Sequence, residues 1–539
     1  MEVVHKFGDR QFRLQHFFES ELTCLPKFYI ANLGEYGRLA HVTPSRDGSY
    51  GGICIGDQDS VSVNYERQGL AFEESLKRHI DLLEKAVLDA DWNKQELLRE
   101  FYSNWLAICD RNRPEFVCAA SGGLEEILVF SPVQGFRRGF EGRYLGITDS
   151  ASELADYSYI AQQGKRRTQV GLGLVVPVSK LKPAPYTDAE LQDWYLDTIS
   201  DNHIPSTYAQ KRGRRFWLIF NADTPSGRTW FGVALNYDGN GKKPLPTTEE
   251  RLKRWSITPL RVTIFNKERL MPRSGADLDL DNKSVLVVGC GSVGGEIAYK
   301  LGAAGIGKLV LSDPDVYSID NIYRHVLSDR YFSWNKAAAL CHSLHAKYPW
   351  VTATFYDKEL LDLRDMNILN SFDLIIIAIG SPTHERKFHD FLEEENVKVP
   401  VINTWLEGYG IGGHAVLDIR NSHGCLRCAY VDLEFGTRGL SSNLNFLEPN
   451  QDLTVNHAGC GELFLPYNAV SAAQTALIAT NLAIGSLLRK ITDSSKVSWK
   501  GDGSEVNASG YSLAHRYTAF NKSLQVLPLY NEECDLCHE

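Results

Sequence analysis

Short apolar runs alternate with mixed polar and apolar stretches through the second half of the chain. The runs begin at Val285 and Leu309, and a third covers Leu374 to Ile379. Their length predicts buried strands, and the stretches between them predict helices. Alternating strands and helices are typical of a parallel sheet covered by helices, in which ligands bind at the carboxyl ends of the strands.

The first 118 residues predict a small α+β domain. Two strand-like segments, Gln11 to Phe18 and Lys27 to Leu33, precede two helical stretches. Apolar residues recur at helical spacing in both stretches, which predicts two helices that each bury one face. These positions are Phe72, Leu76, Ile80, Leu83 and Val87 in the first stretch, and Leu97, Phe101 and Trp105 in the second.

The middle of the chain gives mixed signals. Val170 to Val178 predicts a strand, and Phe216 to Leu235, interrupted by Pro-Ser-Gly, predicts a β-hairpin. No set of residues here suggests catalysis, and the basic runs Lys165 to Arg167 and Lys211 to Arg215 are typical of solvated surfaces. We therefore expect three domains: a small α+β domain at 1–118, a connector or scaffold domain at 119–275, and a larger α/β domain at 276–539.

The composition is that of a globular protein with several domains. Of 539 residues, 43% are hydrophobic and 23% are charged, and this length suggests about three or four domains. The net charge of −10 argues against nucleic acid as the main ligand, because proteins that bind it usually carry a basic excess.

We expect neither an export signal nor a membrane span. The amino-terminal sequence lacks the apolar core of a signal peptide. The apolar stretch from Ala469 to Leu488 is long enough to cross a bilayer, but its polar residues predict a buried helix. A cytoplasmic bacterial protein is expected, in which the eleven cysteines serve as metal ligands, nucleophiles or core residues rather than in disulfides.

A glycine-rich loop follows the first apolar run. In Gly289-Cys-Gly-Ser-Val-Gly-Gly295 the glycines allow a tight turn against a phosphate, and a helix amino terminus that favours anions follows. Dehydrogenases and methyltransferases share this loop and the acid after the second strand, here Asp313. Arg324 and Lys336 favour an adenylating enzyme instead, because such an enzyme must neutralise charge on an α-phosphate.

Residues 269 to 539 resemble the superfamily of ThiF, MoeB and the ubiquitin-activating enzymes. Its members join a protein's carboxyl-terminal carboxylate to AMP and often pass the acyl group to a cysteine. The resemblance implies a Rossmann-like domain in which the first acid holds the ribose of ATP, while the asparagine, arginine and lysine contact the phosphates and the charge that develops there. The implied nucleotide-binding residues are Gly289, Gly291, Gly294, Gly295, Asp313, Asp315, Asn321, Arg324 and Lys336; the last two are also the expected catalytic cations.

One position departs from this superfamily. Its members carry an aspartate that holds magnesium after the fourth strand, whereas this chain has Gly380 there. Mg²⁺ is still the expected cofactor of ATP, held by Asp315 or by another acid if the alignment shifts by a residue. Because the rest of the site is complete, we expect activity to be retained.

Two Cys-x-x-Cys pairs, Cys425 with Cys428 and Cys534 with Cys537, predict a structural Zn²⁺ site. Four thiolates complete a tetrahedral shell and leave no position for water. Zinc would clamp the end of the chain onto the adenylation domain, and ThiF and MoeB relatives carry the same pattern. The competing interpretation, a redox pair beside an unrelated pair, lacks a thioredoxin-like context.

Cys460 lies between glycines in a polar segment, just before a helix expected near Asn468. In the resembling superfamily, a crossover loop at this place carries the cysteine that takes the activated carboxylate as a thioester. Cys460 is therefore the first candidate nucleophile; the alternative is a small buried cysteine at a glycine turn.

Cys54 is the second candidate nucleophile. It lies in Gly51-Gly-Ile-Cys-Ile-Gly56, after a His41-Val pair and before two helices. Taken alone it reads as a core residue. The order of elements, however, resembles bacterial ubiquitin-conjugating-enzyme-like domains, in which the corresponding cysteine accepts the acyl group from the adenylating partner. The asparagine that normally follows the His-Pro pair of those domains and their usual first helix are both missing here.

A conjugating-like domain, a connector and an adenylation domain together resemble the fused enzymes of type II CBASS antiphage operons. This resemblance implies ATP-dependent adenylation of a carboxyl terminus, transfer to Cys460 and then to Cys54, and amide formation with a target protein or small-molecule amine. The activated protein in that family is a cGAS-like nucleotidyltransferase, which the reaction primes. MoeB-like relatives further imply a homodimer.

Three alternatives stay open. The activated partner is instead a ubiquitin-like protein, or the chain is a sulfur-carrier adenylyltransferase like MoeB or ThiF, for which Cys54 is dispensable. Gly380 allows a third, a non-catalytic scaffold that binds ATP tightly and releases no AMP.

Overall fold

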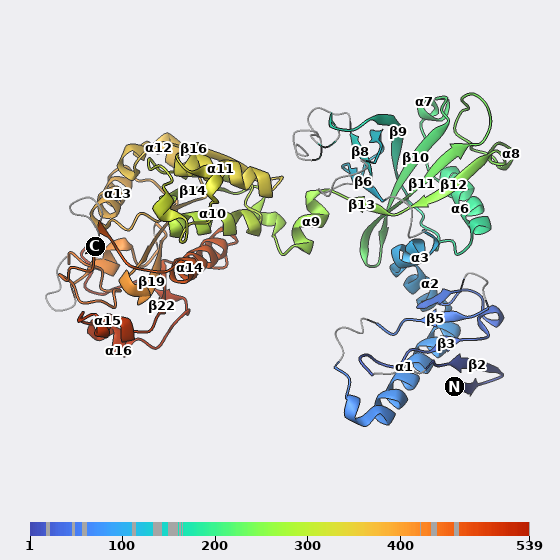
Figure 1. Cartoon of the computed structure of the whole chain (residues 1–539), viewed down its shortest axis with the longest axis horizontal. Coiled ribbons are helices and arrows are strands. Elements are labelled where there is room, and N and C mark those ends of the chain that lie inside the picture. The colour runs from blue at the N-terminus through green and yellow to red at the C-terminus, as the bar shows by residue number, and fades with distance from the viewer. Residues whose placement is uncertain are drawn as a thin grey trace. The chain divides into compact units, whose positions relative to one another are not determined.

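The chain divides into two compact units, Met1–Asn266 and Lys267–Glu539 (Figure 1). The boundary lies a few residues before the start that the sequence suggested for the third domain. The computed structural model describes residues 1–17, 22–45, 49–56, 62–109, 115–132, 143–148, 160, 163, 165–420, 422–432, 439–456 and 463–537.

The first unit begins with an antiparallel sheet of five strands, in the order β1-β2-β3-β5-β4. Helix α1 (Gln68–Leu88) packs its apolar stripe on this sheet, with Leu83 fully buried among the strand residues. The strands are β1 (Glu2–Phe7), β2 (Arg10–Gln15), β3 (Tyr29–Ile30), β4 (Val42–Pro44) and β5 (Gly51–Ile53).

The second predicted helix is in fact two helices, α2 (Ala90–Arg99) and α3 (Phe101–Ile108). Phe101 and Trp105 are fully buried in α3, but they pack against Phe231 of the following sheet and Trp194 of α6, a helix of the same segment. Helix α3 therefore belongs to the core of the segment expected to be a connector.

That segment forms a mixed sheet of eight strands, ordered β12-β11-β10-β9-β7-β8-β6-β13. The predicted hairpin is present: β10 and β11 pair antiparallel, and Gly227 turns between them with φ of 105°. The elements are β6 (Phe116–Ala119), β7 (Glu125–Phe130), β8 (Tyr144–Thr148), β9 (Gln169–Pro177), α6 (Asp188–Asp201), α7 (Ser206–Ala209), β10 (Arg215–Thr224), β11 (Gly227–Tyr237), α8 (Glu249–Leu252), β12 (Trp255–Leu260) and β13 (Val262–Ile264).

The second unit is built on another sheet of eight strands, ordered β16-β15-β14-β17-β18-β19-β22-β23. The strands from β16 to β18 are parallel and the rest are antiparallel. Its strands are β14 (Ser284–Val288), β15 (Lys308–Ser312), β16 (Thr352–Tyr356), β17 (Leu374–Ile377), β18 (Val401–Leu406), β19 (Gly412–Asp418), β22 (Ser495–Lys500) and β23 (Leu527–Pro528), and β20 (Val455–Asn456) pairs separately with β21 (Leu463–Phe464).

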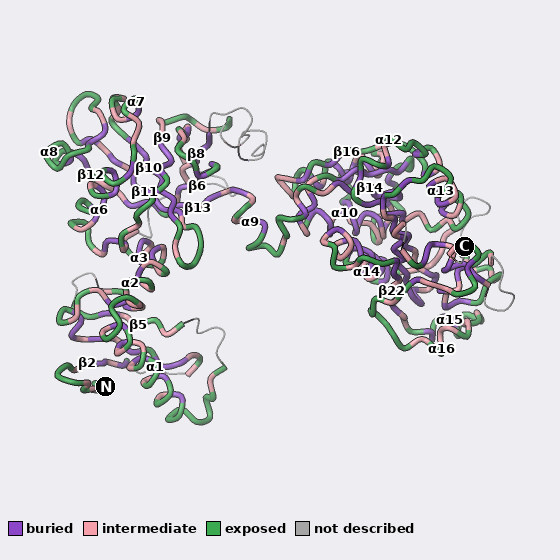
Figure 2. Tube along the Cα trace, turned by 180° about the vertical axis from the view of Figure 1, so that it is seen from behind, coloured by how far each residue is buried: buried purple, intermediate pink, exposed green. Residues whose placement is uncertain are grey.

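Helices cover both faces of this sheet, so residues of β14 alternate between two cores. Val285 and Val287 pack with helices α10 and α14, whereas Leu286 and Val288 pack with α13. Figure 2 shows buried segments in the interior of this unit and exposed segments around its outside. The helices are α9 (Lys267–Arg273), α10 (Ser292–Ala304), α11 (Lys336–Lys347), α12 (Met366–Leu369), α13 (Pro382–Glu394), α14 (Ala469–Leu487), α15 (Ser504–Ala508) and α16 (His515–Ala519).

The strand order reverses at β14, whose neighbours are β15 and β17. This reversal is the switch point of a doubly wound sheet, where ligands bind beyond the carboxyl ends of the strands. The parallel, Rossmann-like fold expected from the sequence is thus confirmed, and the glycine loop lies at its switch point.

Helix α14 is long and apolar enough to pass a length and composition test for a membrane span. It packs on α10, β18, β19 and β22 of its own unit, and 61% of its most apolar window is buried there. Within the described residues this matches the buried helix expected from its polar side chains.

Candidate functional site

The loop between β14 and α10 accepts only glycine at two positions. Gly289 has φ of 87°, and a Cβ there would lie 2.7 Å from the Ala378 carbonyl oxygen. A Cβ on Gly294 would lie 1.8 Å from the carbonyl oxygen of Gly289. Gly291, the N-cap of α10, instead faces open space. The loop therefore packs tightly on the sheet and leaves its outer side open at the helix start.

Arg324 lies beside the start of α10. Its guanidinium carbon is 5.4 Å from the centre of the Tyr467 ring, and the Tyr467 hydroxyl is 2.7 Å from the Ser292 hydroxyl. A cation over an aromatic face is attracted by the ring, so Tyr467 holds Arg324 near the first turn of the helix. Backbone N–H groups at that turn favour a negatively charged ligand.

Asn321 lies on the same connection, in a short 3₁₀ helix, η5 (Ile319–Asn321). Its side-chain oxygen accepts hydrogen bonds from the backbone N–H and hydroxyl of Ser318, at 3.3 and 3.2 Å. Its NH₂ group makes no hydrogen bond to another described residue, which leaves two donors for a ligand.

Asp313 ties the glycine loop to the end of β15. Its two carboxylate oxygens accept hydrogen bonds from the N–H groups of Cys290 (2.6 Å) and Asp315 (2.8 Å). Burial raises the pKa of Asp313, and these two hydrogen bonds oppose the rise. Each oxygen keeps a further lone pair, so the carboxylate still has acceptors for a ribose hydroxyl.

Asp315 and Lys336 form an ion pair of 2.8 Å, in which the lysine side chain is 14% exposed and the aspartate 67%. Lys336 is the first residue of α11, capped by Asn335. The Asn335 side chain also donates to the Asp313 carbonyl oxygen at 2.7 Å. Asn335 had no role in the sequence-based prediction, although an asparagine before a helix is a start signal.

His325 supports the glycine loop from behind. Its Nε2 lies 2.7 Å from the Cys290 carbonyl oxygen, and its Nδ1 accepts from the Leu327 N–H at 3.2 Å. This pattern assigns the proton to Nε2 in a neutral ring, and burial lowers the pKa of His325. The sequence pattern did not assign this histidine a role.

Gly380 follows β17 with φ of 64°, and nothing lies within 4 Å of the place of its Cβ. A left-handed backbone suits glycine and tolerates few other residues. No carboxylate extends from this position, so Gly380 itself offers no side-chain ligand for a metal ion.

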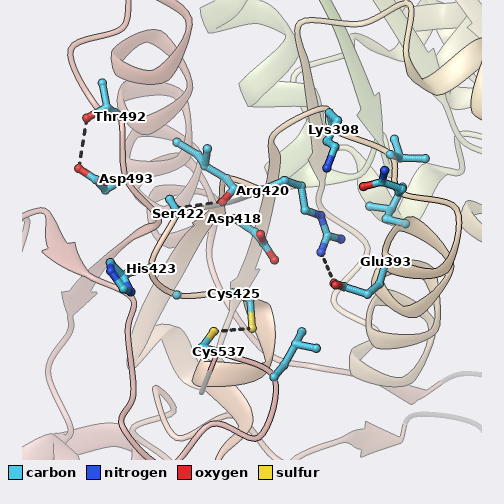
Figure 3. Close-up of a pocket in the computed structure, with 16 residues that line it drawn as sticks. Glu393, Lys398, Asp418, Arg420, Ser422, His423, Cys425, Thr492, Asp493 and Cys537 are labelled. Atoms are coloured by element: carbon cyan, nitrogen blue, oxygen red, sulfur yellow. Dashed lines mark hydrogen bonds and ion pairs between the residues drawn. The ribbon is translucent and has the colours of Figure 1, made fainter. Parts of the chain in front are cut away.

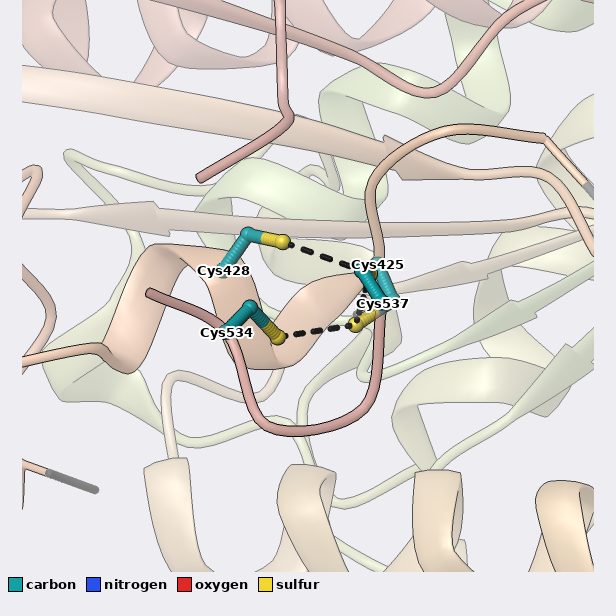
Figure 4. A group of neighbouring side chains, drawn as sticks. All are labelled: Cys425, Cys428, Cys534 and Cys537. Carbon is teal, nitrogen blue, oxygen red and sulfur yellow. Dashed lines mark hydrogen bonds between the residues drawn. The ribbon is translucent and has the colours of Figure 1, made fainter. Parts of the chain in front are cut away.

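The four cysteines of the two Cys-x-x-Cys pairs meet in one cluster (Figure 4), with sulfur atoms all within 4.8 Å of one another. Three measured separations are 3.4, 3.6 and 3.9 Å. Tetrahedral zinc with Zn–S bonds of about 2.3 Å requires sulfur atoms roughly 3.8 Å apart. The cluster of Cys425, Cys428, Cys534 and Cys537 therefore fits zinc, and Asp418 supports it by accepting the Leu426 N–H at 2.9 Å.

A cleft of about 590 Å³ lies beside this cluster (Figure 3). Its charged side chains include both signs, and Arg420 pairs with Glu393 across it. None of the predicted nucleotide-binding residues lines this cleft, so it is separate from the glycine loop.

Cys54 is exposed at the end of β5, which excludes the alternative of a core residue. Its N–H donates to the His41 carbonyl oxygen at 2.8 Å. His41 has φ of 63°, and its ring contacts Glu100 at 2.6 Å and Glu96 at 3.4 Å. The hydrogen bond to Glu100 raises the pKa of His41. Glu96 lies in α2 and Glu100 lies between α2 and α3; the sequence pattern did not connect them with Cys54.

Cys460 lies outside the described residues. The helix expected after it is α14, and Asn468 caps it by accepting the Ser471 N–H at 2.8 Å. The start of that helix also brings Tyr467 to Arg324, as described above.

Residues 268–525 match the ThiF family. Over 265 residues the chain is 29% identical to the ATP-dependent ubiquitin transferase-like protein Cap2 of Pseudomonas aeruginosa, covering 47% of this chain and 46% of that protein. The Cap2 protein of Escherichia coli is 27% identical, over 39% of this chain and 35% of its own length. The adenylyltransferase and sulfurtransferase UBA4 of Scheffersomyces stipitis is 28% identical, and the match covers 31% of this chain and 38% of that protein.

The chain thus spans less than half the length of these relatives. Among solved structures, Escherichia coli MccB with MccA-N7isoASN covers 48% of this chain and 68% of its own, at 15% identity and a TM-score of 0.34. The segment that matches the ThiF family contains the glycine loop, the switch point of the doubly wound sheet, and Cys425 and Cys428 of the four-cysteine cluster.

Proposed function

We propose that this chain is an ATP-dependent enzyme that adenylates the carboxyl terminus of a protein and conjugates it to an amine. The supporting observation is the convergence, at the switch point of a ThiF-family domain, of the glycine loop, the start of α10 and two cations, Arg324 and Lys336. Phosphoryl chemistry needs positioning and charge neutralisation above all, and this site supplies both.

In the first step the phosphates of ATP bind at the start of α10, and Asp313 accepts a hydrogen bond from the ribose. A carboxylate oxygen of the acceptor protein attacks the α-phosphorus, and the bond to pyrophosphate breaks. Arg324, Lys336 and the Asn321 amide neutralise the charge that accumulates on the α-phosphate oxygens. The products are an acyl-adenylate and pyrophosphate.

Mg²⁺ would be held by the phosphates together with Asp315. Magnesium is commonly bound by one or two carboxylates plus substrate phosphates, and Asp315 is an exposed carboxylate at this edge of the sheet. When bound, the ion would offset phosphate charge. Gly380 contributes no ligand, so this arrangement differs from one that uses an acid at that position.

Two thioester steps follow. The Cys460 thiolate attacks the acyl carbon and AMP leaves; the Cys54 thiolate then attacks the same carbon and the Cys460 thiolate leaves. A target amine finally attacks the acyl carbon of the Cys54 thioester, the Cys54 thiolate leaves, and the nitrogen loses a proton to give an amide. Exposure of Cys54 beside the His41 and Glu100 pair supports its place as the last carrier.

We infer that the acceptor is the carboxyl-terminal tail of a cGAS-like nucleotidyltransferase and that the reaction serves antiviral defence in the bacterial cytoplasm. The similarity to the Cap2 proteins supports this choice. A ubiquitin-like acceptor is the second candidate, because those relatives are ubiquitin transferase-like proteins. The target is a protein or small-molecule amine, and the working form is a homodimer.

A sulfur-carrier adenylyltransferase is a further candidate, favoured by the similarity to UBA4. It needs the adenylation site but not Cys54. A scaffold that binds ATP without reaction, suggested by Gly380, needs neither cysteine and forms no AMP.

Mass spectrometry of the trapped thioester tests the proposal. The full-length protein is incubated with ATP in extract of its own cells, alkylated without reduction and digested. We expect a carboxyl-terminal peptide of one protein attached to Cys460 or Cys54. The identity of the attached peptide decides whether the acceptor is a nucleotidyltransferase or a ubiquitin-like protein. If the protein binds ATP normally but forms no thioester, the proposal is contradicted.

A further inference from the structure

A basic pocket lies in the first unit, in the segment for which no function has been assigned. Its cavity is about 820 Å³ and lies where β9 and β10 begin and β11 ends. Five of its lining residues are basic and one is acidic. The basic residues are Lys211, Arg212, Arg214, Arg215 and Lys242, and the acid is Asp238.

The backbone holds this basic segment in a fixed conformation. Gly213 exchanges two hydrogen bonds with Lys243, at 2.9 and 3.0 Å, and the Tyr237 N–H donates to the Arg214 carbonyl oxygen at 2.9 Å. A Cβ on Gly213 would lie 3.3 Å from the Phe216 ring, so the absence of a side chain lets the segment pack closely against this buried ring. The cationic side chains therefore project from a braced strand edge.

Most of this charge is unneutralised by the protein. Lys211 pairs with Glu126 at 2.7 Å, whereas Arg212, Arg214, Arg215 and Lys242 form no ion pair with any residue that the structure describes. The chain as a whole carries −10. Adjacent cations repel one another, which disfavours this arrangement in the free protein. A bound anion would offset the repulsion.

The shape and chemistry of the pocket select among anions. Guanidinium groups bind phosphate and carboxylate through two parallel hydrogen bonds. A cavity of this volume is within the usual range for small-molecule sites, about 300–1,000 Å³, and suits a compact ligand with several charges. Tyr208 and Tyr237 line it but are buried, which leaves no exposed ring on which nucleic acid bases would stack.

We propose that this pocket binds a compact ligand that carries two or more linked phosphate groups. Arg212, Arg214, Arg215 and Lys242 supply the hydrogen bonds and positive charge for these phosphates. The site is separate from the ATP site of the ThiF-family domain, and it gives the middle segment a binding role in place of the solvated surface that its sequence suggested.

Hydrogen exchange of the full-length protein with inorganic triphosphate tests this proposal, because it reports the two sites through different peptides. We expect protection of peptides that cover residues 208–216 and 236–243. In the variant Arg212→Gln/Arg214→Gln the triphosphate concentration for half-protection there should rise at least about tenfold. Protection of peptides around residues 286–296 should be unchanged.

The matched control is Arg251→Gln/Lys253→Gln, which removes two exposed cations of the same unit that do not line the pocket. It should bind as the wild type does. Protection confined to residues 286–296, or equal loss in both variants, would overturn the proposal. So would stronger protection of 208–216 by an acidic peptide or a single-stranded oligonucleotide than by triphosphate.

Discussion

At the scale of single residues, the candidate nucleotide site depends on backbone partners as much as on side chains that face a ligand. Asp313 accepts the Cys290 N–H, His325 contacts the Cys290 carbonyl oxygen, and Asn335 donates to the carbonyl oxygen of Asp313. These bonds brace the glycine loop against the second strand. A braced loop keeps its phosphate-binding N–H groups in place before the ligand arrives.

Lys336→Ala removes a cation that we place at the α-phosphate. ATP–pyrophosphate exchange with the acceptor present should fall by about 10²–10³-fold, the usual cost of losing one group that stabilises transition-state charge. Lys347→Ala, at the opposite end of the same helix, is the control and should exchange normally. Equal exchange in both variants would remove Lys336 from the mechanism.

The His41 and Glu100 pair predicts a pH dependence near Cys54. Because the pKa of His41 is raised in the folded protein, the charged pair stabilises the fold fully below the ordinary histidine pKa, about 6.5. That stabilisation is lost as pH rises through the raised pKa. We expect the free energy of local opening to fall by about 1 kcal/mol between roughly pH 6 and pH 9.

Hydrogen exchange of the peptide covering residues 49–56, corrected for intrinsic rates, measures this opening, since the Cys54 N–H bonds to the His41 carbonyl oxygen. In His41→Asn the dependence should disappear; asparagine tolerates the left-handed backbone at this position. A dependence that persists in this variant would show that another group titrates.

The chemical role of a residue was predictable from the sequence only where its partners lie close to it along the chain. The glycines, Asp313 and Lys336 stand at fixed offsets from an apolar run, so a single segment reveals them. Glu96 and Glu100 could not be linked to Cys54 in this way, because α2 reaches the end of β5 only after the chain has folded.

At the scale of elements, the sequence predicts the strands and helices whose apolar residues recur at a regular spacing. It does not predict which sheet a helix packs against. The β10–β11 hairpin and the β14–α10–β15 unit form where expected. Helix α3 continues the spacing of α2, yet it packs on the second sheet. Periodicity identifies the buried face of a helix but not the sheet that buries it.

The four-cysteine cluster connects the segment after β23 to the short 3₁₀ helix η9 (Leu426–Tyr430). Cys534→Ser should lower bound zinc from about one ion per chain to a small fraction. It should also destabilise the second unit by at least about 2 kcal/mol, because metal binding is coupled to folding. Elemental analysis and thermal unfolding measure the two effects.

Cys24→Ser is the control, since Cys24 lies outside the cluster in the first unit; its zinc content should not change. Full zinc occupancy in Cys534→Ser would contradict the four-thiolate site.

At the scale of the whole molecule, the chain joins a unit that matches the ThiF family to a first unit with an exposed cysteine, Cys54, close to His41 and its two glutamates. The two units are separate compact bodies. The proposed relay carries the acyl group from Cys460 in the second unit to Cys54 in the first, either by motion of a loop or by transfer between the subunits of the proposed homodimer. The sequence predicted the Rossmann-like sheet, but it did not reveal the basic pocket, because strands distant in sequence close it.

The order of the relay is tested most directly by non-reducing gels of Cys54→Ala and Cys460→Ala, with ATP and the labelled acceptor identified by mass spectrometry. The account predicts that Cys54→Ala accumulates a thiol-sensitive adduct on Cys460 and forms no amide. It also predicts that Cys460→Ala still releases pyrophosphate but forms neither adduct nor amide. Full amide product from both single variants would contradict the relay.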